Sequence, residues 1–235
     1  MINLIFPKRC PICDGIITGD RLICDECINI PRRVREPRCM KCSKHLDSDE
    51  IMYCRDCEKH KKHYARGIAL YEYDSVKDSI NNFKNASRPE FASFYADRIV
   101  HFLGSEIKDF NADALIPIPL HTSKFKKRGY NQSKLIADEI SKRMGIPVLD
   151  NVLQRKIKTK EQKKLDDTDR QKNLVGAFHM PQNGVKLYNV ILVDDVYTTG
   201  STIDEAARTL LDGGVEKVYF VTVAIGHETM GKSLK

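Results

Sequence analysis

The sequence predicts an α/β fold, a mostly parallel sheet flanked by helices, preceded by a small N-terminal zinc-ribbon domain. All eight cysteines lie within the first 57 of 235 residues, as four Cys-x-x-Cys pairs. Beyond residue 64, short apolar runs alternate with segments of helical periodicity, which is the pattern of an α/β protein. We therefore expect a cysteine-rich domain over residues 1–63 and an α/β domain over residues 64–235.

The cysteine pairs predict two structural Zn²⁺ sites. A Cys-x-x-Cys turn points two sulfurs at one ion, and two such turns complete a tetrahedral shell of four sulfurs. The segment lacks the apolar periodicity of a core, so metal has to supply its folding energy. We expect sequential ribbons; an interleaved arrangement stays open, because the gaps of ten, eleven and eleven residues are nearly equal. The eight ligands are Cys10, Cys13, Cys24 and Cys27, then Cys39, Cys42, Cys54 and Cys57.

A disulfide framework is the rival interpretation of these cysteines, and it would require export. The apolar N-terminal stretch, residues 1–6, is too short for a secretory signal. No run approaches the roughly 18 apolar residues that a membrane span needs. We therefore expect a cytoplasmic protein without a membrane span, whose cysteines bind metal.

The positive charge of the chain is concentrated in one segment. The formal net charge is +7, and residues 121–173 alone hold fifteen Lys and Arg against seven Asp and Glu. Two four-thiolate zinc sites would lower the net charge to about +3. Such an uneven distribution favours an anionic ligand near this segment.

The expected strands and helices follow one another along the rest of the chain. Apolar runs predict strands at residues 67–73, 114–117, 148–153, 177–180, 190–193 and 218–224. Amphipathic periodicity predicts helices at residues 75–84, 89–103, 131–144 and 202–211. Gly213 and Gly214 close the last of these helices.

Residues 190–202 are the chemical centre of the sequence. An apolar strand leads to Asp194 and Asp195, at the strand end where open α/β sheets place ligands. A loop rich in hydroxyls follows and runs directly into a helix, whose free N–H groups attract phosphate. Carboxylates beside a phosphate site suit sugar hydroxyls or a divalent cation, so a phosphorylated ribose fits both halves. The Walker lysine is absent, which argues against a nucleotide-triphosphate loop.

These thirteen residues resemble the binding signature for 5-phosphoribosyl-1-pyrophosphate (PRPP) in type I phosphoribosyltransferases. Three further segments, Ile-Pro-Ile-Pro-Leu-His at 116–121, Arg-Gly-Tyr-Asn-Gln at 128–132 and residues 173–178, accompany the four cysteine pairs. With them, the chain resembles over essentially its whole length the ComF family of competence-associated proteins. The resemblance implies a type I phosphoribosyltransferase-like domain behind a double zinc ribbon.

The resemblance also implies roles for individual residues. Asp194 and Asp195 would hold the ribose hydroxyls, with Mg²⁺ nearby. Arg128 and Arg155 would stabilise the leaving pyrophosphate, and the basic stretch 155–172 would close over it as a flap, although a solvated charged loop is the alternative. The pyrophosphate loop would include Leu120 and His121. The 5-phosphate ligands would be Thr198, Thr199, Gly200, Ser201 and Thr202.

Three functions remain open at this stage. The first is PRPP binding with Mg²⁺ and phosphoribosyl transfer to an acceptor that no residue identifies, linked to competence and DNA uptake. The second is binding of single-stranded DNA, in which the phosphate cradle and the basic flap meet the backbone phosphates and the zinc ribbons assist. A patch of cations and aromatic rings would add charge and stacking, although its tyrosine could equally belong to the core. The third is a ligand sensor or scaffold that docks other DNA-uptake proteins through the zinc module. The patch consists of Lys124, Phe125, Lys126, Lys127, Arg128 and Tyr130.

Overall fold

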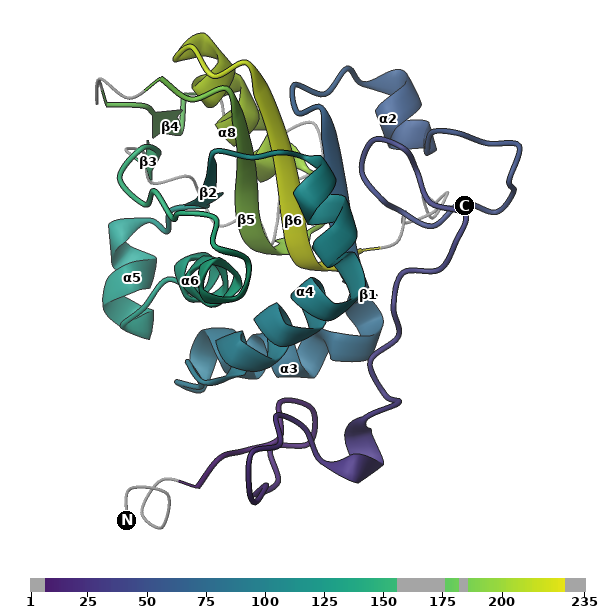
Figure 1. Cartoon of the computed structure of the whole chain (residues 1–235), viewed down its shortest axis with the longest axis vertical. Helices are drawn as coiled ribbons and strands as arrows, with labels where there is room; N and C mark the ends of the chain where they lie inside the picture. The colour runs from purple at the N-terminus through teal and green to yellow at the C-terminus, as the bar shows by residue number, and fades with distance from the viewer. Residues whose placement is uncertain (1–6, 156–175, 182–185, 227–235) are drawn as a thin grey trace, which may run out of the picture.

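A four-stranded parallel sheet forms the centre of the protein (Figure 1). The computed structural model describes residues 7–155, 176–181 and 186–226. The strands lie in the order β1-β6-β5-β2, and each neighbouring pair is parallel, so all four carboxyl ends meet at one edge. The strands are β1 (Arg66–Glu72), β2 (Ala114–Pro117), β5 (Asn189–Tyr197) and β6 (Lys217–Ile225).

Helices cover both faces of the sheet, which confirms the predicted α/β class. One apolar cluster joins one face of the sheet to three helices, and a second joins the opposite face to α8 (Ser201–Asp212). Residues 190–193 of β5 are fully buried, as expected of an apolar strand covered on both faces. The three helices are α3 (Tyr73–Asn85), α4 (Phe91–Asp109) and α6 (Gln132–Met144).

The two halves of the cysteine-rich region pack differently. The first ribbon (residues 7–30) has a small apolar cluster of its own, and Arg88 binds it through Asp14 with two 3.0 Å contacts. The second ribbon (residues 38–60) contributes Cys39, Cys42 and Cys54 to the same apolar cluster as α8. The second ribbon is therefore part of the core of the α/β unit. The ribbons contain the short helices η1 (Asp25–Cys27) and α2 (Arg55–Lys59).

The linker between the ribbons covers one edge of the sheet. Val34 N–H donates to the carbonyl of Leu70 at 3.0 Å, and Glu72 N–H donates to the carbonyl of Arg32 at 2.8 Å. Arg33 and Tyr71 form the antiparallel bridge between these bonds. The linker thus satisfies the backbone groups that an exposed edge strand would leave open to another chain.

Several predicted elements differ from the structure. Residues 148–153 are not a strand: Val148 forms a single parallel bridge to Leu115, and Asp150 and Asn151 are poor strand formers. The residues that follow form β3 (Gln154–Arg155), which pairs with β4 (Phe178–His179) in a two-stranded sheet. The helix α5 (Thr122–Arg128) was not predicted, because its strongly charged sequence has no apolar face.

No helix within the described ranges combines the length and the apolar character that crossing a membrane requires.

Candidate functional site

The strand β5 carries both predicted carboxylates. It continues past residue 193 to Tyr197, so Asp194 and Asp195 lie within the strand, where the sequence analysis had placed them just beyond it. The backbone N–H of Asp195 donates to Asp194 Oδ1 at 2.9 Å. Burial, followed by the neighbouring charge of Asp195, raises the pKa of Asp194 to about 7. The site therefore holds two adjacent carboxyl groups, one of which gains a proton near neutral pH.

Two side chains that the sequence analysis missed complete the carboxylate site. Ser133, at the start of α6, donates its hydroxyl to Asp194 Oδ1 at 2.9 Å. Lys84, in the last turn of α3, places Nζ 2.7 Å from Asp195 Oδ1. Both come from helices far away along the chain. The only signal in the sequence was a lysine at the end of a predicted helix, which is also typical of a solvated helix terminus.

The hydroxyl loop (residues 198–202) lies directly after β5, two residues beyond the carboxylates. All five of its residues line one small hollow together with Asp194. Gly200 is the N-cap of α8 in the left-handed region, with φ +76°, and a Cβ there would lie 2.2 Å from the hydroxyl of Tyr197. The loop thus presents hydroxyls and the start of a helix at one point, which suits a phosphate group.

The second ribbon and the residues just after it pack against the strand and the helix that flank the hydroxyl loop. The Tyr197 and Tyr64 hydroxyls are 2.8 Å apart, and the Tyr197 ring stacks on Phe220 at a centroid distance of 5.0 Å. His63, just after the ribbon, donates its backbone N–H to Asp204 in the first turn of α8 at 2.6 Å. Burial raises the pKa of Tyr197, so its hydroxyl stays protonated and available for the bond to Tyr64. The loop and the second ribbon therefore form one packed unit.

The segment after β2 approaches the same edge of the sheet. Ile118 N–H donates to the carbonyl of Val193 at 2.9 Å, and Asn131 Nδ2 donates to the carbonyl of Ile118 at 3.0 Å. These bonds place the start of this segment beside β5, and Leu120 follows and lines a hollow next to Pro119. His121 is the N-cap of α5, where its ring accepts from Ser123 N–H at 3.1 Å.

The two arginines predicted to act in catalysis lie on different elements, Arg128 at the end of α5 and Arg155 on β3. Arg128 donates to Gln132 Oε1 at 3.0 Å, at the start of the helix that also carries Ser133. Arg155, on β3, interacts electrostatically with Asp194, and burial lowers its pKa. The remainder of the predicted flap, residues 156–172, falls outside the described residues.

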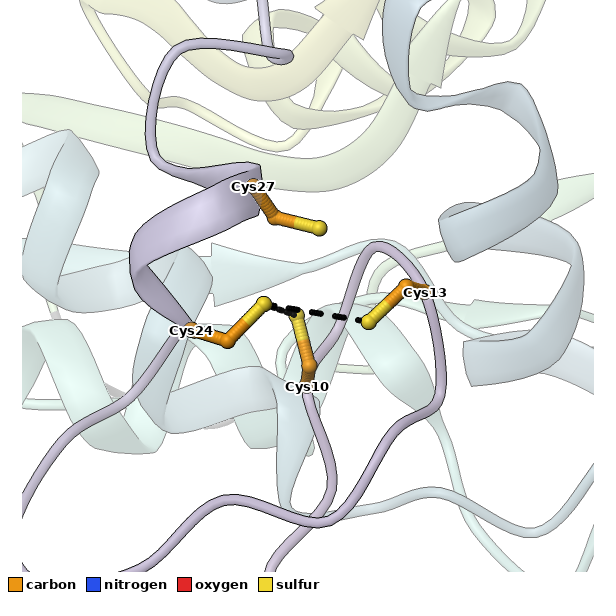
Figure 2. A group of neighbouring side chains, drawn as sticks. All are labelled: Cys10, Cys13, Cys24 and Cys27. Atoms are coloured by element: carbon orange, nitrogen blue, oxygen red, sulfur yellow. Dashed lines mark hydrogen bonds between the residues drawn. The ribbon is translucent and has the colours of Figure 1, made fainter.

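The cysteines form two sequential clusters, and none of the eight is in a disulfide. Figure 2 shows the first, Cys10, Cys13, Cys24 and Cys27, with the four sulfurs pointing toward one another. A tetrahedral site with Zn–S bonds of about 2.3 Å puts neighbouring sulfurs about 3.8 Å apart. The Sγ atoms of Cys13 and Cys24 are 3.8 Å apart, and those of Cys42 and Cys54 are 3.6 Å apart. The residues therefore fit two structural zinc ions, and the sequential arrangement is confirmed.

Asp194 makes stability depend on pH. Its pKa of about 7 exceeds the ordinary value of 3.8, so the folded chain holds a proton that the unfolded chain releases. The favourable contribution is complete below about pH 4 and is lost as the pH rises through 7. We expect Asp194→Asn to raise the melting temperature at pH 8 and to change it little at pH 4, measured by scanning calorimetry. An equal change at both pH values, or the same pattern for exposed Asp49→Asn, would contradict this expectation.

Comparison with known proteins agrees with these observations. The double zinc ribbon domain model matches residues 1–58, and the phosphoribosyl transferase domain model matches residues 131–235. Competence protein F of Haemophilus influenzae is 29% identical over 231 residues, with 93% of this chain and 96% of that protein covered. Competence protein ComFC of Bacillus subtilis is 27% identical, with 85% and 82% covered. The DNA utilization protein YhgH of Escherichia coli K12 is 25% identical, with 89% and 86% covered.

The structure has a carboxylate pair and a hydroxyl loop at the carboxyl edge of a parallel sheet, preceded by two four-cysteine clusters. These features agree with the matches to a double zinc ribbon domain and a phosphoribosyl transferase domain. Along most of its length the chain is similar to the competence proteins F and ComFC.

Proposed function

We propose that this protein binds PRPP together with Mg²⁺ and transfers its phosphoribosyl group to an acceptor. The observation that carries the proposal is the order of groups on one continuous segment. Two carboxyl groups on β5 are followed at once by the hydroxyl loop and the start of α8. The carboxylates can accept hydrogen bonds from the hydroxyls of a ribose, and the loop can donate hydrogen bonds to its 5-phosphate.

The leaving pyrophosphate would lie among cations, on the side of the carboxylates opposite the hydroxyl loop. Lys84 reaches Asp195 from α3, and Arg155 interacts with Asp194 from β3. Arg128 and the segment carrying Leu120 and His121 approach from the end of β2. Cations placed around a departing pyrophosphate stabilise the charge that develops on it.

The carboxylate oxygens of Asp194 and Asp195 fit Mg²⁺, which prefers oxygen ligands and usually keeps several waters. When bound, the ion would neutralise charge on the pyrophosphate. In the reaction, the acceptor nucleophile forms a bond to ribose C1. The bond from C1 to the pyrophosphate oxygen breaks, and pyrophosphate leaves with that electron pair. The acceptor gives up its proton to solvent or to a nearby base.

A calorimetric titration tests the binding step. We expect the zinc-loaded protein to bind PRPP in the presence of Mg²⁺, and Asp194→Asn/Asp195→Asn to weaken this binding by at least about a hundredfold, since charged contacts are worth several kcal/mol. Asp49→Asn, which alters an exposed carboxylate, is the matched control. Absence of binding by the unmodified protein, or equal binding by the double variant, would contradict the proposal.

A second function, binding of single-stranded DNA, is favoured by the surface of α5. Its lysines are exposed, and Phe125 is 49% exposed beside an apolar hollow of about 320 Å³. Bases stack on exposed aromatic rings while cations meet the backbone phosphates. Tyr130 does not belong to this surface, because its hydroxyl donates to the carbonyl of Phe83. Relatives that are named as DNA utilization and competence proteins point in the same direction.

The salt dependence of DNA affinity tests this function. Removing two phosphate contacts should lower the slope of log affinity against log salt by about 1.4 for a single strand. We expect this change for Lys126→Ala/Lys127→Ala, measured by fluorescence anisotropy with an oligothymidylate. The control is Lys59→Ala/Lys61→Ala, which removes two exposed lysines, one at the end of the second ribbon and one just after it. Unchanged slopes in the first variant would exclude α5 as the DNA-binding surface.

A further inference from the structure

The first ribbon holds the short turn between α3 and α4 (residues 86–90) by a two-point ion pair. Arg88, in this turn, donates from Nε and from one terminal nitrogen to the two carboxylate oxygens of Asp14, each at 3.0 Å. A guanidinium that meets both oxygens of one carboxylate is fixed in direction as well as in distance. The ion pair therefore sets where this turn lies relative to the first ribbon.

The position of Asp14 is set by the first cysteine turn. Asp14 directly follows Cys13, and its backbone N–H donates to the carbonyl of Cys10 at 2.9 Å. Cys10 N–H in turn donates to the carbonyl of Gly15 at 2.7 Å. Figure 2 shows the sulfurs of Cys10 and Cys13, from the two ends of this turn, pointing toward the other pair. The carboxylate that holds Arg88 is thus attached to the frame of the first four-cysteine cluster.

The backbone between α3 and Arg88 depends on contacts of this kind. Ser87 has a φ of +53°, in the left-handed region that serine rarely adopts. A residue other than glycine keeps such a conformation only where its surroundings hold it. The ion pair of the neighbouring Arg88 supplies one such contact from the first ribbon. Loss of that ion pair should let the turn relax.

A second contact joins the turn to the carboxylate site. The hydroxyl of Tyr130 donates to the carbonyl of Phe83 in the last turn of α3, and it also interacts with the backbone of Arg88. Tyr130 lies two residues before α6, the helix whose Ser133 binds Asp194. The turn therefore lies between the first ribbon and an element that reaches the carboxylates.

The last turn of α3 carries the lysine of the site. Lys84 precedes Arg88 by four residues, and its Nζ lies 2.7 Å from Asp195 Oδ1. The lysine side chain has four flexible methylene groups, so its reach is set by where its backbone lies. Helix ends fray unless they are held. Fixing the turn just beyond Lys84 therefore keeps its ammonium group on the carboxylate.

We propose that Arg88 is a positioning residue for the carboxylate site and that the first ribbon thereby controls PRPP binding. Asp14 holds Arg88, Arg88 holds the turn, and the turn keeps Lys84 on Asp195. The inference rests on the proposed PRPP binding and adds a means of regulation to that site. It gives the first ribbon, which has an apolar cluster of its own, a role beyond folding.

A double-mutant cycle tests the inference by calorimetric titration with PRPP and Mg²⁺. Arg88→Met should weaken PRPP binding about tenfold, and so should Asp14→Asn, which keeps a residue that tolerates positive φ. Lys84→Met should weaken binding at least as much. Adding Arg88→Met to Lys84→Met should cost less than about twofold more, because the group through which Arg88 acts is gone. The control Arg21→Met, which removes an exposed ion pair with Asp25 in the same ribbon, should leave the affinity unchanged.

Phosphorus NMR at saturating PRPP separates positioning from a loss of folding. In Arg88→Met the 5-phosphate resonance should respond as in the unmodified protein, because the hydroxyl loop is intact, while the pyrophosphate resonances respond less. Additive losses in the cycle, or a reduced response of all resonances alike, would overturn the positioning role. If PRPP binds the unmodified protein and Arg88→Met with equal affinity, only this inference fails. If the unmodified protein does not bind PRPP, the proposed function itself fails.

Discussion

Replacing Cys42 by serine is expected to destabilise the whole chain, whereas replacing Cys10 should destabilise only the first ribbon. Both side chains are fully buried, and each belongs to one four-cysteine cluster. Cys42 lies in the same apolar cluster as α8 and β6, while Cys10 lies in the small cluster of the first ribbon. Structural zinc contributes about 10–16 kcal/mol of apparent binding energy, and this energy is coupled to folding.

The two variants are matched controls for each other. Scanning calorimetry should show a melting temperature for Cys42→Ser that is lower by about 10 °C or more, since each kcal/mol shifts a domain of this size by about 2–4 °C. Cys10→Ser should leave the main transition nearly unchanged. Zinc analysis should give a loss of one ion in each variant. Equal shifts of the main transition in the two variants would contradict the different packing assigned to the two ribbons.

Replacing Gly200 by alanine should abolish PRPP binding. The new methyl carbon would lie 2.2 Å from the Tyr197 hydroxyl, which is held by Tyr64 and by stacking on Phe220. Since the tyrosine cannot move without breaking these contacts, the loop has to shift and its hydroxyls no longer converge. We expect an affinity loss of at least about a hundredfold, equivalent to some 3 kcal/mol, measured by calorimetry.

Gly145→Ala separates this steric effect from backbone strain. Gly145 has nearly the same φ, +75°, at the end of α6, and nothing lies within 4 Å of the Cβ that would be added. The left-handed conformation costs alanine about 1–2 kcal/mol at either position. Gly145→Ala should therefore lose stability and keep PRPP affinity. Similar affinities in the two variants would contradict the role assigned to the packing of Tyr197 against Gly200.

Features contiguous in sequence could be predicted well. The cysteine pairs, the apolar strand β5, the carboxylates and the hydroxyl loop are each short motifs whose chemistry depends on near neighbours. Their spacing alone predicts that the carboxylates and the hydroxyl loop lie close together, and Asp194 and the loop line one hollow. The main helices could also be predicted, since amphipathic periodicity persists over two or more turns in α3, α4, α6 and α8.

Features that depend on long-range packing could not be predicted. The approach of Lys84 to Asp195 depends on where α3 crosses the sheet, and sequence spacing does not contain that information. The same holds for the second ribbon, whose cysteines predict a metal site without indicating that it packs beside Tyr197. The contact of Arg88 with Asp14 likewise joins segments that are far apart in the sequence, and therefore only the structure reveals it.

Phosphorus NMR of PRPP titrated with the zinc-loaded protein and Mg²⁺ tests the central claim most directly, because the 5-phosphate and the pyrophosphate give separate resonances. The hydroxyl loop should shift and broaden the 5-phosphate resonance, and Gly200→Ala should remove this effect while Gly145→Ala preserves it. If the 5-phosphate resonance stays unperturbed, or responds equally in all three proteins, the hydroxyl loop is not the phosphate site.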